Sequence, residues 1–69
     1  KMNIKQAYFE LTKSIMENHN VQAEKAFNKM CAVLNVTSEK DKDLLFDCLY
    51  NRACSENTAE IIQKYTENV

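Results

Sequence analysis

The chain contains neither glycine nor proline in its 69 residues. At average usage of about 7% glycine and about 5% proline, roughly eight such residues are expected in a chain of this length. Without them the chain lacks the usual residues for β-hairpin turns and phosphate-binding loops, and for left-handed helix caps. The sequence therefore predicts an all-α fold in a single domain over residues 1–69.

Apolar spacing predicts an αα-hairpin in the first half of the chain. The first helix is expected over residues 3–17, and its inward face follows helical spacing. After a polar break over residues 17–20, Asn20 is expected to cap a second helix over residues 21–34. The inward positions are Ile4, Tyr8, Leu11 and Ile15 in the first helix, and Ala23, Phe27, Met30 and Leu34 in the second.

The second half of the chain predicts another pair of helices. Thr37 or Ser38 is expected to cap the third helix, whose inward residues begin at Leu44. A second polar break at residues 54–57 separates it from a fourth helix over residues 58–67, with Ser55 or Asn57 as its cap. The alternative is one continuous helix over residues 38–67, because no residue between 52 and 58 forbids a helix. We favour the break, and hence four helices in two αα-hairpins.

The three cysteines, Cys31, Cys48 and Cys54, are an odd number, which argues against a self-contained disulfide framework. Cys48 and Cys54 are separated by about 9 Å of rise and about 240° of rotation if they share one helix, so they cannot pair there. We expect reduced, buried thiols. An intermolecular disulfide through Cys54 is the alternative.

The charge pattern indicates neither a membrane segment nor a basic surface. Nine basic and ten acidic residues are spread along the whole chain, with a formal net charge of -1. No apolar run approaches the roughly 18 residues of a membrane span, and no secretory leader opens the sequence. We expect a soluble cytoplasmic protein, with the native chain starting at Met2.

Candidate catalytic and metal-binding groups are scarce. The single histidine, His19, falls in a predicted loop with no adjacent motif to orient it, so a Cys–His pair is not expected. No pair of ligands has the spacing of a zinc site, and the acidic stretch from Asp41 lacks the glycine of a calcium loop. The sequence predicts no enzyme activity, no cofactor and no metal.

Two predicted helices carry more apolar surface than a simple bundle needs. In the third helix, apolar side chains cover about two thirds of the circumference at 100° per residue. In the first helix, Phe9 and Met16 lie about 100° or more from the inward face, with Met2 expected beside them. We expect this surplus surface to contact a protein, through Phe9, Met16, Phe46 and Tyr50. The alternative is that steeply crossed helices bury both stripes within the fold.

These features predict a small helical protein that binds another protein as a regulator, inhibitor or assembly adaptor. A chain this short buries only about 60% of its surface on folding, so self-association, most simply as a homodimer, would help to stabilise it. The alternative is a regulator of transcription or replication that associates with nucleic acid. We consider that less favoured, because Lys5, Lys13, Lys25 and Lys29 are interleaved with glutamates.

Overall fold

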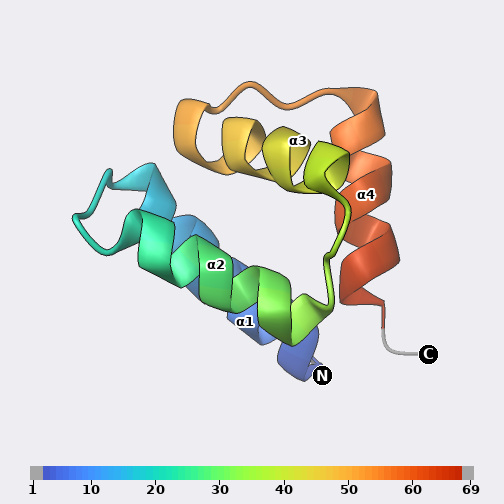
Figure 1. The fold of residues 1–69 in the computed structure, drawn as a ribbon, viewed down its shortest axis with the longest axis horizontal. Coiled ribbons are helices and arrows are strands. Elements are labelled where there is room, and N and C mark those ends of the chain that lie inside the picture. Colours follow the sequence, from blue (N-terminus) through green and yellow to red (C-terminus); the bar gives the residue numbers. More distant parts are fainter. Residues whose placement is uncertain (1–2, 68–69) are drawn as a thin grey trace.

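The computed structural model describes residues 3–67, which form four helices and no strand. They are α1 (Ile4–Glu17), α2 (Ala23–Leu34), α3 (Glu39–Asn51) and α4 (Glu56–Thr66). Helices α1 and α2 lie side by side, α3 lies across one face of this pair, and α4 runs steeply across the N-terminal end of α3 (Figure 1). The predicted all-α class and the break before the fourth helix are confirmed.

Side-chain caps begin three of the four helices. Asn3 and Ser55 each form a capping box with the residue three positions later, and the Ser38 hydroxyl accepts a hydrogen bond from the Asp41 amide. Helix α2 starts two residues later than predicted and has no side-chain cap, although the Asn20 side chain accepts a bond from the Gln22 amide. Polar cap residues therefore fix most helix starts.

Two helices end in the left-handed conformation that glycine usually adopts, at Asn35 (φ 62°) and Arg52 (φ 58°). Asparagine tolerates this conformation better than most residues, whereas arginine has no such advantage. The turn at Arg52 ends α3, and the connection then runs back along α3 before α4 begins (Figure 1). Asparagine and arginine thus adopt the left-handed helix C-cap conformation in place of glycine.

The core lies between the α1–α2 pair and α3. All four inward positions predicted for the second helix are buried, as are Leu45 and Leu49 of α3. The corresponding prediction for α1 is wrong in its orientation. Its buried residues are Phe9, Thr12 and Met16, while Ile4 and Leu11 are exposed.

No helix within residues 3–67 is both long and apolar enough to cross a membrane. Met2, expected beside the second stripe of the first helix, lies outside the described residues.

Candidate functional site

The four residues predicted as protein contacts are all part of the core or packed against it. Met16 is fully buried and Phe9 nearly so, so the expectation that they form a second, exposed stripe is wrong. Phe46 and Tyr50 are half-buried and pack against the core. The steep crossing of the helices explains this result, because α3 and α4 cover the Phe9–Met16 side of α1.

Phe46 and Tyr50 belong to a continuous row of aromatic rings. Phe27 meets Phe46 edge to face at 5.1 Å between centroids, and Phe46 stacks on Tyr50 at 5.2 Å. Tyr50 stacks in turn on His19 at 4.4 Å, and the His19 Nε2 lies 2.9 Å from the Tyr50 carbonyl oxygen. These rings attach the α1–α2 connection to the end of α3, which accounts for much of the surplus apolar surface predicted on the third helix.

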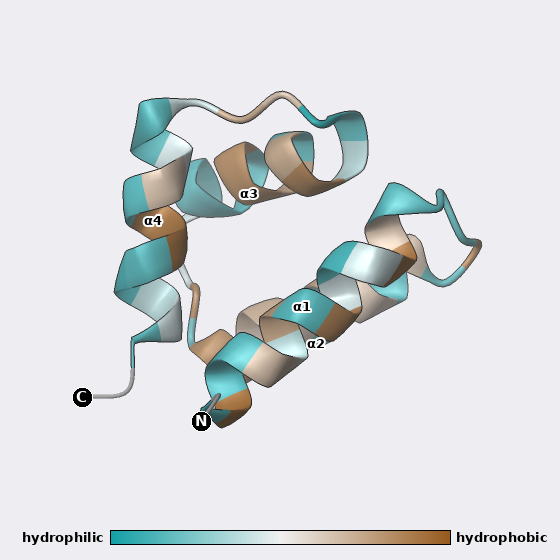
Figure 2. Ribbon diagram, turned by 180° about the vertical axis from the view of Figure 1, so that it is seen from behind, coloured by the Kyte–Doolittle hydropathy of each residue, from teal (hydrophilic) through white to brown (hydrophobic). Residues whose placement is uncertain are grey.

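Apolar surface remains instead on the outer side of the α1–α2 pair. Ile4 is 78% exposed, Leu11 59% and Val33 of α2 39%. Tyr8, Ile15 and Ala26 are half-buried. We call this set the outer seam: Ile4, Tyr8, Leu11, Ile15, Ala26 and Val33. Figure 2 shows the α1–α2 pair from behind, with hydrophobic segments along α1.

Lysines border the outer seam, whereas the nearby acids lie elsewhere. Lys29 is three residues after Ala26 and four before Val33, so it shares their face of α2, and Lys25 is one turn away. Glu24 lines the groove against α3, and Glu10 lines a small groove on the other flank of α1. The outer seam is therefore an apolar strip with a basic edge.

The groove between α2 and α3 has the opposite charge. Its volume is about 800 Å³, with Phe27 and Phe46 in its lining. Four carboxylates line it against one lysine, Lys42. The four carboxylates are Glu24, Glu39, Asp43 and Asp47. Within residues 3–67 no group of three or more histidine, cysteine or acidic side chains is placed to hold a metal ion.

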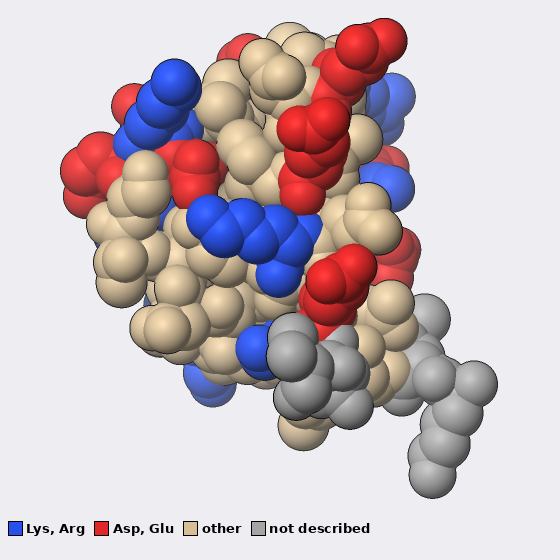
Figure 3. Space-filling view, turned by 90° about the vertical axis from the view of Figure 1, so that its right-hand side faces the viewer, with Lys and Arg blue, Asp and Glu red and all other residues tan. Residues whose placement is uncertain are grey.

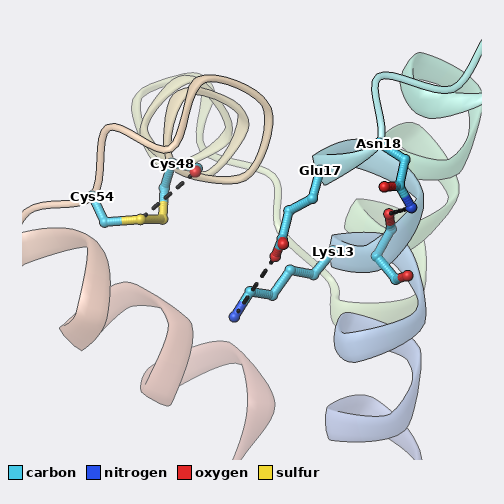
Figure 4. A network of polar contacts seen from close by, with 6 residues as sticks. Lys13, Glu17, Asn18, Cys48 and Cys54 are labelled. Carbon is cyan, nitrogen blue, oxygen red and sulfur yellow. Dashed lines mark hydrogen bonds and ion pairs between the residues drawn. A yellow bond between two sulfur atoms is a disulfide. The ribbon is translucent and has the colours of Figure 1, made fainter.

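Cys48 and Cys54 form an intramolecular disulfide, which corrects the expectation that both thiols are reduced. The predicted separation applies only if both residues lie in one helix. Because the chain reverses at Arg52, Cys54 returns to a Cα–Cα distance of 4.4 Å from Cys48. The Cys54 sulfur also lies 3.6 Å from the Cys48 carbonyl oxygen (Figure 4). Cys31 is a free, buried cysteine, as expected, and burial raises the pKa of its thiol.

The disulfide forms part of the wall of a pocket between α1, α3 and α4, with a volume of about 370 Å³. Figure 4 shows the disulfide and the Lys13–Glu17 pair on opposite sides of this space. Phe9, Leu49, Ala59 and Ile62 supply apolar lining, while Arg52 and Ser55 add polar groups. We call this space the disulfide pocket.

Charged side chains on the α4 side of the molecule are of mixed sign. Figure 3 shows basic and acidic side chains interspersed on that face, without a continuous basic area. Nucleic-acid binding would need clustered positive charge, which this face does not provide.

Comparisons with family models, with curated proteins and with solved structures found no match to this chain. The geometry of the outer seam and of the disulfide pocket is therefore the basis for inferring function.

Proposed function

We propose that this protein acts without catalysis, by binding another protein through the outer seam. The single observation that carries the proposal is the exposure of Ile4 and Leu11, two turns apart on one face of α1, together with that of Val33 on α2. Contiguous apolar side chains left in contact with water commonly mark protein-binding surfaces. This surface replaces the predicted contact residues Phe9 and Met16, which are buried.

An amphipathic helix with an acidic edge is the partner that suits this surface. Ile4, Tyr8, Leu11 and Ile15 repeat at intervals of three or four residues, so they form a straight strip along α1. A helix laid against such a strip buries its own apolar face. Acidic residues along its edge would meet Lys25 and Lys29 across the contact.

A second copy of the chain fits the outer seam less well. In a two-fold dimer whose axis crosses the strip, Lys25 and Lys29 of both copies lie along the same edge and repel each other. The homodimer predicted from the sequence remains a prediction, which sedimentation velocity across a range of concentrations tests directly.

The test compares two substitutions of exposed aliphatic residues. Leu11→Asp places a charge in the outer seam, whereas Val21→Asp does the same in the α1–α2 connection, where Val21 is 95% exposed. A partner is first isolated from the native source with the unmodified protein, then purified and titrated by calorimetry. We expect Leu11→Asp to weaken binding by about 30-fold, the effect of losing about 2 kcal/mol at an interface hot spot.

Val21→Asp is expected to bind as the unmodified protein does. Equal weakening by both substitutions, with both proteins still helical by circular dichroism, would place the contact outside the outer seam. A captured partner that proves to be DNA or RNA, with affinity falling steeply as salt rises, would favour the nucleic-acid alternative instead.

The Cys48–Cys54 disulfide supports a location other than the predicted cytoplasm. Disulfides persist where thiols are oxidised and are rare in the reducing cytosol. We infer that the chain matures in an oxidising compartment. When cells are lysed directly into denaturant containing an alkylating reagent, so that buried thiols also react, mass measurement should show a single label, at Cys31. Labelling of all three cysteines would support the cytoplasmic location.

A further inference from the structure

The disulfide pocket combines an apolar interior with positive charge at its rim. Phe9 and Leu49 are core residues of α1 and α3, and half-buried Ile62 of α4 completes the apolar lining. A volume of about 370 Å³ lies within the range of about 300–1,000 Å³ typical of small-molecule sites. The pocket therefore has the size and lining to hold an apolar ligand.

The charged groups of the pocket favour an anion. Its lining includes two cations, Lys13 and Arg52, and one carboxylate, Glu17. The Lys13 Nζ lies 4.0 Å from the Glu17 Oε1, at the limit of an ion pair, and both side chains are substantially exposed. Such a pair is weak in water, so Lys13 can exchange it for a ligand carboxylate. Within residues 3–67 Arg52 forms no ion pair.

The disulfide gives this pocket a fixed wall. It closes the short chain segment from Cys48 to Cys54, which includes Arg52 at the helix end. A group whose backbone is already held in place loses less conformational entropy when it binds a ligand. The backbone of Arg52 is thus held beside the pocket before any ligand arrives.

We propose that the disulfide pocket binds a linear monocarboxylate with an apolar tail. The carboxylate lies between Lys13 and Arg52, where the cations outnumber the carboxylate by one. The tail packs against Phe9, Leu49 and Ile62. This site is separate from the outer seam and does not depend on the proposed protein partner.

Sodium decanoate, kept below its micelle concentration, is the probe for this proposal. Backbone amide shifts in a nuclear magnetic resonance titration are expected at residues lining the disulfide pocket. From hexanoate to decanoate, each added methylene should tighten binding by about fourfold, the ratio that corresponds to about 0.8 kcal/mol per buried methylene. Decyltrimethylammonium, with a tail of similar length and a positive head group, should bind at least tenfold more weakly.

Substitutions at the rim test the role of charge. Arg52→Gln is expected to weaken decanoate binding about tenfold, and Arg52→Lys should restore most of the affinity because it keeps the charge. Lys40→Gln removes an equal charge from the exposed first turn of α3, away from the pocket, and should leave binding unchanged. If Arg52→Gln fails to fold, Lys13→Gln provides the same comparison from α1.

Three results would overturn the proposal. The first is the absence of shifts at decanoate concentrations that approach micelle formation. The second is shifts centred on Ile4, Leu11 and Val33, which would show that the tail only coats the outer seam. The third is equal binding of decanoate and decyltrimethylammonium, which would show that the charged rim does not select the ligand.

Discussion

The α1–α2 hairpin and helix α4 are attached to the same core by different means. The hairpin contributes most of the buried apolar side chains, including Phe9, Met16, Phe27 and Met30. Helix α4 has no fully buried aliphatic or aromatic residue, and its buried residues are Thr58 and Thr66. Its apolar side chains, at Ile61, Ile62 and Tyr65, are only half-buried.

Covalent and polar links hold α4 in place. The disulfide fixes the connection that precedes it, and Ser55 caps its first turn. Asn3 donates a side-chain hydrogen bond to the Thr66 carbonyl oxygen at 3.1 Å. Tyr65 donates one to the Asp41 carboxylate at 2.6 Å. The apolar interior is thus largely completed by three helices, and the loosely filled space beside the fourth is the disulfide pocket.

Truncating one apolar residue in each region should give the largest difference. Met30→Ala removes a fully buried side chain, and we expect it to lower the free energy of unfolding by about 2–5 kcal/mol. Ile62→Ala removes a half-buried side chain beside the pocket and should cost about 1 kcal/mol. Urea denaturation followed by circular dichroism measures both. Equal losses would show that α4 is packed as firmly as the hairpin.

Removing the disulfide should destabilise α4 selectively. Replacing both Cys48 and Cys54 by alanine reopens a loop of sequence separation 6. The chain-entropy relation gives about 2 kcal/mol for so short a loop. Hydrogen exchange should show faster amide exchange in α4 and smaller changes in α1 and α2. Cys31→Ala, which leaves the disulfide intact, is the matched control, and uniform acceleration in all four helices would contradict selective attachment.

The number of helices could be predicted from the sequence, because it depends on local signals. The absence of glycine and proline predicts helix, and polar segments containing Asn20, Ser38 and Ser55 predict the breaks. These signals act within a few residues of chain, so they need no knowledge of the tertiary structure.

The orientation of α1 and the pairing of the cysteines could not be predicted in the same way. Helix α1 has two apolar stripes, one containing Leu11 and one containing Met16, and only the positions of α3 and α4 decide which is buried. The pairing of Cys48 with Cys54 depends on the left-handed turn at Arg52, a residue type that carries no signal for that conformation. Both candidate sites result from these two long-range features.

Loss of the Ser55 cap should have a moderate effect that is again confined to α4. The Ser55 hydroxyl accepts a hydrogen bond from the Thr58 amide at 3.2 Å, so Ser55→Ala should lower the free energy of unfolding by about 1 kcal/mol. Ser55→Asp keeps an acceptor at the cap and should retain most of the stability. If Ser55→Ala were neutral, the disulfide alone would be sufficient to start α4.

The smallest expected effect is a loss of stability at high pH through the Tyr65–Asp41 contact. The hydrogen bond to Asp41 raises the pKa of Tyr65 above its ordinary value of 10.0. The folded state therefore holds this proton more tightly than the unfolded state. The resulting stability is fully present below the unfolded pKa and is lost as the pH rises through the folded pKa.

Tyr65→Phe should therefore flatten the stability curve as the pH rises above the ordinary tyrosine pKa of 10.0. The pKa of Cys31 is also raised, from its ordinary value of 9.0, so this thiol too makes the folded state lose stability at high pH. Both proteins are therefore compared in a Cys31→Ala background, which removes this second contribution. Urea denaturation at each pH gives the free energies of unfolding. An unchanged slope after Tyr65→Phe would mean that the Tyr65 hydroxyl does not link α4 to α3. The attachment of α4 would then rest on the disulfide, the cap and the Asn3–Thr66 bond.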